Sequence, residues 1–285
     1  MRFSGINLAP SFLLSLIACV CLPGAGARAN LYAQEADPAQ RPSVIVRTAE
    51  GARGIEFYER GYFKEAVKLL KQATDNRRDD ATAWHFLGLA YKQLDKEKDA
   101  RKALENAVFL RLSHLTSLSS RGIVKPWEEM TKEEREARRR EMTARYREAL
   151  TSVESYLQLK PKAEDFWRQQ YEGLSFYVLN NEKPEAEREV FQGNDEGVTK
   201  AQILFKPEPE YSERAREKGT KGTVTLRGLL ASDGTVKHVI ALGMLPDGLT
   251  EQSIKVMRRI KFRPATKNGR PVSQWVMIEY NFNIY

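Results

Sequence analysis

The chain has 285 residues, which gives room for one to three domains, and its hydrophobic content of 41% is enough for packed cores. The formal net charge is +8. The only cysteines, Cys19 and Cys21, lie near the N-terminus, and the three histidines are far apart in sequence. This pattern excludes a disulfide framework later in the chain and any familiar Cys/His metal-site spacing.

Residues 1–29 have the pattern of an export signal peptide. Arg2 supplies a positive start, an apolar run fills residues 11–22, and Ala27-Arg28-Ala29 has the small-x-small form that signal peptidase accepts. We therefore expect an exported protein of the periplasm or cell envelope that begins near Asn30. Residues 30–46 are expected to be a flexible N-terminal segment.

Two other interpretations of the N-terminus stay open. Leu16-Ile17-Ala18-Cys19 resembles a lipobox, so Cys19 is a candidate for lipidation. Alternatively, the segment is kept as an inner-membrane anchor, although it offers only about 12 uninterrupted apolar residues where roughly 20 are needed to span a bilayer.

Residues 47–180 are predicted to form an all-α region built from helical repeats. Between residues 47 and 112 a pattern recurs with a period of 34, and Gly54 returns as Gly88. The same period joins Phe57 to Tyr91, Ala66 to Ala100, Leu70 to Leu104 and Ala73 to Ala107. This set resembles the tetratricopeptide repeat, a helical hairpin whose small residues let the two helices approach closely.

A third, degraded repeat is expected further along. Its markers are Ala149, Val153, Tyr156, Pro161 and Trp167. An insertion over 114–130, with Gly122 and Pro126 as helix breakers, separates it from the second repeat. Thr131 is expected to begin a charged helix, and another helical pattern runs over 164–180. The polar residues 181–202 are predicted to be a linker.

The repeat resemblance also implies a peptide-binding groove. By the repeat pattern, the inner face of this groove carries Tyr58 from the first repeat and Thr82, His85 and Lys92 from the second. These four residues are candidate binding residues.

The segment from residue 203 to 285 predicts a small α+β domain. Ser212 is a plausible cap of a helix that runs to Lys218, and strands are expected over 223–231 and 236–242. Asp233-Gly234 between those strands predicts a primed hairpin turn. Pro246-Asp-Gly-Leu-Thr250 should begin a helix that ends near Ile260. Asn268-Gly269 predicts another turn before a final strand of alternating apolar residues.

This ordered set of turns, helices and strands resembles the C-terminal domain of the TonB family. The resemblance implies an antiparallel sheet packed on two helices, so the whole chain is expected to be a multidomain protein, all-α and then α+β. It also implies that the domain binds an extended segment of an envelope protein, such as a TonB-dependent outer-membrane receptor, by adding that segment as a strand. The edge strand would span about Ser273 to Asn283, with Trp275, Met277 and Tyr280 flanking the added strand.

No catalytic motif is visible, so we predict a non-enzymatic protein without cofactor, metal or nucleic-acid partner. The favoured function is an exported adaptor in protein–protein interaction, linked to outer-membrane transport. One alternative is a TonB-type energy transducer anchored by an uncleaved N-terminus, although the long Pro-rich spacer of such proteins is missing. A second alternative is an envelope scaffold whose TonB-like domain only forms a homodimer.

Overall fold

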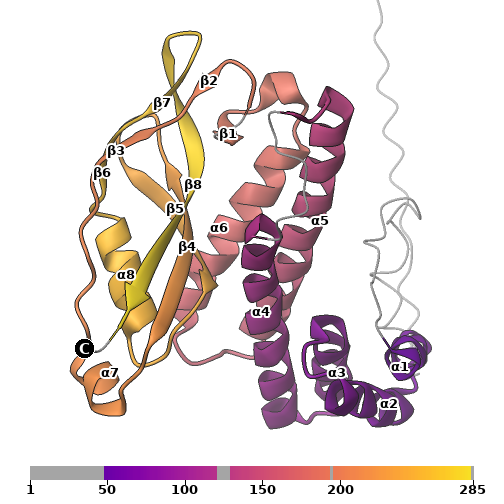
Figure 1. The fold of residues 1–285 in the computed structure, drawn as a ribbon. Coiled ribbons are helices and arrows are strands. Elements are labelled where there is room, and N and C mark those ends of the chain that lie inside the picture. The colour runs from indigo at the N-terminus through magenta and orange to yellow at the C-terminus, as the bar shows by residue number, and fades with distance from the viewer. Residues whose placement is uncertain (1–47, 121–128, 193–194, 284–285) are drawn as a thin grey trace, which may run out of the picture. The chain divides into compact units, whose positions relative to one another are not determined.

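The computed structural model describes residues 48–120, 129–192 and 195–283, all of which belong to one compact unit. A helical region comes first, and the strands follow with two shorter α-helices among them (Figure 1). The predicted signal peptide, Cys19 and the 30–46 segment lie outside the described residues. Among the described helices, none is long and apolar enough to cross a membrane.

Two helical hairpins open the described chain, and they repeat one packing arrangement. Helix α1 (Ala49–Glu59) pairs with α2 (Phe63–Asn76), and α3 (Ala81–Gln93) pairs with α4 (Glu97–Ser120). A β-carbon added at Gly54 would lie 2.7 Å from Cγ of Leu70, and one added at Gly88 would lie 2.6 Å from Cγ of Leu104. The predicted close approach of the paired helices at both glycines is therefore confirmed.

A third helix pair follows. Helix α5 (Lys132–Leu157) begins at Thr131, whose hydroxyl accepts the Glu134 N–H while the Glu134 carboxylate accepts the Thr131 N–H. These reciprocal bonds satisfy two otherwise unpaired donors and explain the start of the helix. Helix α6 (Glu164–Glu182) packs against α5. The insertion was predicted to begin at His114, but α4 continues to Ser120; Gly122 and Pro126 lie outside the described residues.

Six of the described strands form one sheet. A path of five strands in the order β2-β7-β8-β4-β5 is hydrogen-bonded, and β1 pairs with β8 off this path. A separate ribbon joins β3 to β6. The strands are β1 (Val190–Gln192), β2 (Val198–Thr199), β3 (Gln202–Phe205), β4 (Gly222–Leu230), β5 (Val236–Gly243), β6 (Lys261–Arg263), β7 (Ala265–Lys267) and β8 (Arg270–Phe282).

Two helices cover one face of this sheet, as predicted. Helix α7 (Glu213–Lys218) begins where the Ser212 hydroxyl accepts the Ala215 N–H, and α8 (Leu249–Met257) follows β5. The apolar side of α8 faces the same buried cluster as the even-numbered residues of β8. That cluster includes Leu249, Val256, Met257, Ile260, Ile278, Tyr280 and Phe282.

The two predicted hairpin turns differ in type. At the β7–β8 turn, Asn268 and Gly269 both have positive φ, as a primed turn requires. At the β4–β5 turn only Gly234 has positive φ among residues 232–235, and the Ala231 N–H bonds to the Thr235 carbonyl. The prediction of a primed turn at Asp233-Gly234 was wrong. The loop there has three residues, with the glycine in the left-handed position.

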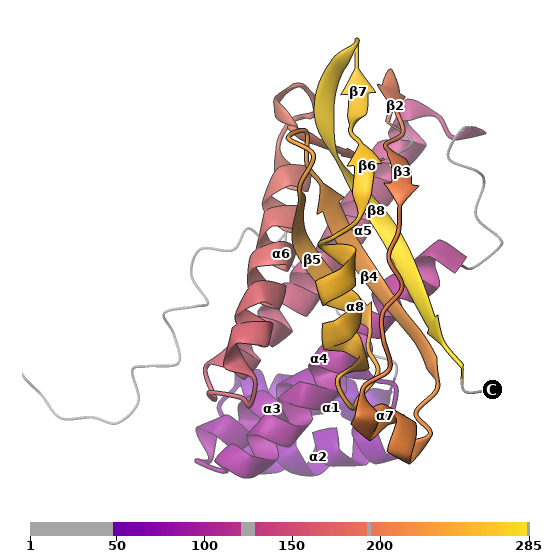
Figure 2. The ribbon, with the colours of Figure 1, turned by 90° about the vertical axis from the view of Figure 1, so that its left-hand side faces the viewer.

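The opposite face of the sheet is covered by the helical region. Trp275, Leu229, Ile240 and Leu242 from the strands share one buried cluster with side chains of α4, α5 and α6. Figure 2 shows α6 beside β5. The helices and the sheet therefore share a core.

The segment 181–202 is more than the predicted linker. It contains a 3₁₀ turn, η3 (Glu185–Glu187), and the strands β1 and β2, which join the sheet. The sheet thus begins before residue 203, where the C-terminal domain was predicted to start.

Candidate partner-binding site

A strand-adding site needs a sheet edge with unpaired backbone groups, and the outer edge of β5 is already occupied. The side chain of Gln170, from α6, is only 1% exposed, and its Oε1 accepts the Ala241 N–H at 2.7 Å. Its Nε2 lies 3.5 Å from the Val239 carbonyl oxygen. Helix α6 therefore covers the edge of β5 with a side-chain amide in place of a strand.

The outer edge of β8 is partly open. Strand β4 pairs with β8 from Gln274 to Phe282, and on the other side β1 runs parallel to β8, aligned with Ser273 to Trp275. Beyond Trp275, β4 is the only described strand that pairs with β8. There the Lys206 ammonium donates to the Glu279 carbonyl at 3.1 Å. The predicted edge strand from Ser273 to Asn283 thus differs from the structure over Ser273–Trp275, where β1 is already paired.

The side chains of the three residues predicted to flank an added strand pack against other parts of the chain. Trp275 is 4% exposed and lies with its ring 5.6 Å from that of Tyr177 in the core under α6. Met277 packs against the same core. Tyr280 is buried on the opposite face, under the Lys206 ammonium. The structure shows these three residues in contacts within the chain. Their role in partner binding stays a prediction.

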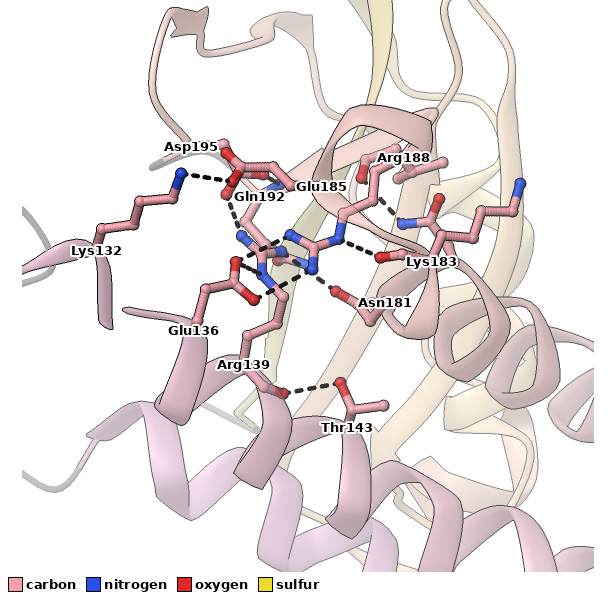
Figure 3. Close-up of polar contacts among 12 residues, drawn as sticks. Lys132, Glu136, Arg139, Thr143, Asn181, Lys183, Glu185, Arg188, Gln192 and Asp195 are labelled. Atoms are coloured by element: carbon pink, nitrogen blue, oxygen red, sulfur yellow. Dashed lines mark hydrogen bonds and ion pairs between the residues drawn. The ribbon is translucent and has the colours of Figure 1, made fainter. Parts of the chain in front are cut away.

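An ion-pair network joins β1 and its flanks to helix α5 (Figure 3). The Arg139 guanidinium, whose side chain is 8% exposed, donates to the Asp195 carboxylate at 2.5 Å and to the Asn181 side-chain oxygen at 3.3 Å. The other oxygen of Asp195 accepts the Gln192 N–H at 2.7 Å. Asp195 thus ties the end of β1 to α5.

A second pair holds the start of β1. Both Nη atoms of Arg188 bond to the Glu136 carboxylate, at 3.1 and 3.3 Å, and Nε donates to the Lys183 carbonyl. The bonds from Arg188 hold the pKa of Glu136 below its ordinary value, with nearby positive charge as a further cause. The Asn180 amide adds a bond to the Val190 carbonyl at 3.0 Å.

Strand β3, in the separate ribbon with β6, carries an apolar patch. All four residues of β3 are exposed, and Ile203, Leu204 and Phe205 are among the large hydrophobic side chains that face solvent, with Phe205 at 58% exposure. Strand β3 pairs only with β6 among the described strands. An exposed apolar strand with one unpaired edge is a typical place for another chain to bind.

Three of the four predicted groove residues lie on α3 and face α5, and the role of all four in binding stays a prediction. Thr82 lines a polar cavity of about 180 Å³ between α3, α4 and α5, together with Arg111 and Glu148. Lys92, near the other end of α3, bonds to the side chain of Gln158 at the end of α5. The Tyr58 ring packs edge-on against Phe86, 5.4 Å away.

His85 is a core residue and not a groove residue. It is 5% exposed, and its Nδ1 lies 3.0 Å from the Ser152 hydroxyl, which also accepts from Arg111 at 2.7 Å. Burial, and then the charge of Arg111, lower the pKa of His85 well below its ordinary value. The sequence did not reveal this polar cluster, because Ser152 and Arg111 belong to helices far from His85 in sequence.

The sheet and its two helices agree with a known family. Residues 207–284 match the family model described as Gram-negative bacterial TonB protein C-terminal. The C-terminal sheet is a TonB-like domain. A comparison with curated proteins returns no match. The family match indicates an envelope-associated role in protein interaction. The strands β1, β2 and β3 precede the matched residues.

Proposed function

We propose that this protein is an exported, non-enzymatic adaptor whose TonB-like domain binds an extended segment of an envelope or outer-membrane protein. The observation that carries the proposal is the outer edge of β8 within the family match, where β4 is the only described strand that pairs beyond Trp275. A chain that lies along this edge would gain backbone hydrogen bonds with Glu279 and its neighbours, after displacing the Lys206 ammonium.

The helical region, proposed to be of the tetratricopeptide type, fits a supporting and partner-recruiting role. Its repeated hairpins carry the same close contacts at Gly54 and Gly88, and its last helices share a core with the sheet. The proposed location is the periplasm or cell envelope, which rests on the signal pattern of residues 1–29 and on the family match.

Capture from envelope extracts tests the proposal. The full-length chain is used as bait, because removing the helices would expose the core residues of the sheet. We expect recovery of an outer-membrane protein, identified by mass spectrometry. Proline at Glu279 should abolish recovery, since it removes an N–H that points the same way as the carbonyl bonded to Lys206.

The matched control is Glu279→Ala, which removes the exposed side chain and keeps the N–H group. It should recover the same protein as the unmodified chain. Recovery that is unchanged by Glu279→Pro, in a variant with native circular dichroism, would show that the edge of β8 is not the binding site.

A dimerising scaffold is the second candidate, and the exposed apolar strand β3 favours it. Two copies could pair through Ile203, Leu204 and Phe205. Sedimentation of the full-length chain over a range of concentrations tests this function. A dimer that dissociates on Leu204→Lys would support it, and a monomer at all concentrations would exclude it.

A further inference from the structure

Strand β1 occupies part of the edge that the proposed function requires. It lies parallel to β8, aligned with Ser273 to Trp275, on the side opposite β4. It is three residues long and comes from a polar stretch outside the matched family residues. A short strand of this kind is held by what surrounds it more than by its own backbone bonds.

The surroundings of β1 define what can lie there. Val190 is 3% exposed and belongs to the core shared with the helices. Phe191 is 7% exposed, and the Lys267 ammonium lies 4.4 Å from the centre of its ring. Two adjacent apolar residues therefore fill the two sides of the strand position.

Opposite charges at the two flanks complete the fit. Arg188, two residues before Val190, pairs with Glu136, and Asp195, four residues after Phe191, pairs with Arg139. Glu136 and Arg139 both belong to α5, so they stay in place if β1 leaves (Figure 3). Arg139 also lies 3.5 Å from the Glu136 carboxylate, and an incoming segment that brings its own carboxylate would restore the bond that Asp195 makes.

We propose that β1 is a resident strand that a partner segment replaces. The incoming segment is extended, runs parallel to β8, and carries an apolar pair with a basic residue before it and an acidic residue after it. This inference rests on the proposed function. It extends the binding edge of β8 from Glu279 to Ser273–Trp275 and states what sequence that added part accepts. The site is filled in the free protein. The apparent affinity for a partner therefore equals the intrinsic affinity multiplied by the fraction of molecules in which β1 is released.

The chain supplies its own probe. A labelled peptide with the sequence of residues 188–195 (Arg-Glu-Val-Phe-Gln-Gly-Asn-Asp) is titrated into the full-length protein and into Asp195→Asn. The variant weakens the hold on β1, whereas the peptide still carries the carboxylate that bonds to Arg139. We expect it to bind the peptide about tenfold tighter or more than the unmodified chain does.

Two controls make the result specific. Glu196→Gln makes the same charge change one residue further along, at an exposed side chain, and should bind the peptide like the unmodified chain. A peptide with Phe191→Asp should not bind either protein. Equal binding by Asp195→Asn and the unmodified chain, or binding of the Phe191→Asp peptide, would overturn the proposal.

Hydrogen exchange on the unmodified chain gives a test that does not depend on a variant folding. A saturating concentration of the peptide should speed exchange of the amides of residues 190–192 while those of residues 273–275 stay protected. Unchanged exchange in β1 at saturation would overturn the proposal.

The peptide experiments need no envelope partner. An envelope capture that recovers no protein, together with a positive peptide result, would therefore count against the proposed function alone. A captured partner with no peptide binding would count against the resident strand alone.

Discussion

The Gln170 side chain of α6 bonds to the backbone of Ala241 in β5, with Oε1 accepting the N–H at 2.7 Å. This bond closes an edge of the sheet from within the same chain. It also places a polar side chain at 1% exposure, where its loss leaves a backbone N–H without a partner.

Gln170→Leu should therefore destabilise the protein. We expect the free energy of unfolding to fall by about 1–3 kcal/mol, the usual cost of a buried donor left unsatisfied. Urea denaturation followed by circular dichroism measures it. The neighbouring Gln169→Leu, at an exposed side chain, should change stability by less than about 0.5 kcal/mol. Similar effects of the two substitutions would show that the bond to Ala241 contributes little.

The buried His85 should make stability depend on pH. Its folded pKa lies well below 6.5, so the unfolded chain binds a proton near that pH while the folded chain does not. The free energy of unfolding should therefore fall as the pH drops below about 6.5. Above that pH the contribution of His85 to the free energy of unfolding should stay constant. Comparing the unmodified chain with His85→Asn at about pH 8 and about pH 5.5 tests this. The stability advantage of histidine should shrink at the lower pH, and a constant difference would contradict the prediction.

The contribution of Glu136 to stability should depend on pH in the acidic range. Its folded pKa is below the ordinary value of 4.5, because Arg188 bonds to the ionised carboxylate. The stability that this group contributes is present above the unfolded pKa and is lost as the pH falls through the folded pKa. The difference in melting temperature between the unmodified chain and Glu136→Gln should thus narrow from pH 7 to pH 3. A difference that is independent of pH would mean that the pairing does not stabilise the fold.

An isolated fragment of residues 200–283 should expose apolar surface. Leu229, Ile240 and Trp275 are each at most 4% exposed in the whole chain because the helices cover them. We expect this fragment to bind the dye ANS strongly and to associate, whereas a chain of residues 48–283 should do neither. A monomeric fragment that ignores the dye would show that the sheet folds independently of the helices.

The mature N-terminus decides between the interpretations of residues 1–29. We expect mass spectrometry of the protein from its native host to give a chain that begins near Asn30. An acylated Cys19 at the N-terminus would indicate a lipoprotein. Retention of Met1 would favour the anchored energy transducer.

The sequence was sufficient where short-range chemistry decides the structure. Ser212 caps α7 and Asn268-Gly269 forms the primed turn, since each depends on residues a few positions apart. The spacing of Gly54 and Gly88 likewise predicted the close helix contacts, because repetition in sequence implies repetition in packing.

Long-range pairing could not be predicted in the same way. Strand β1 is three residues in a polar stretch, and its partner Ser273–Trp275 lies some eighty residues later. Trp275 was predicted to flank an added strand, because alternation shows that a strand has two faces but not what covers each of them. The helices α4 to α6 cover that face, so both sides of β8 contain buried residues.

The contact between α6 and β5 also limits how this architecture can change over generations. A β-carbon at Gly173 would come 2.8 Å from Cγ1 of Ile240, so the two positions accept new side chains only in matched combinations. A TonB-like sheet borrowed from another protein would bring its own residue at the position of Ile240 and would meet a helix shaped for a different partner. Chimaeras joined between Glu182 and Val190 would therefore need compensating changes on both sides, and recombination would preserve the two parts as a single inherited unit.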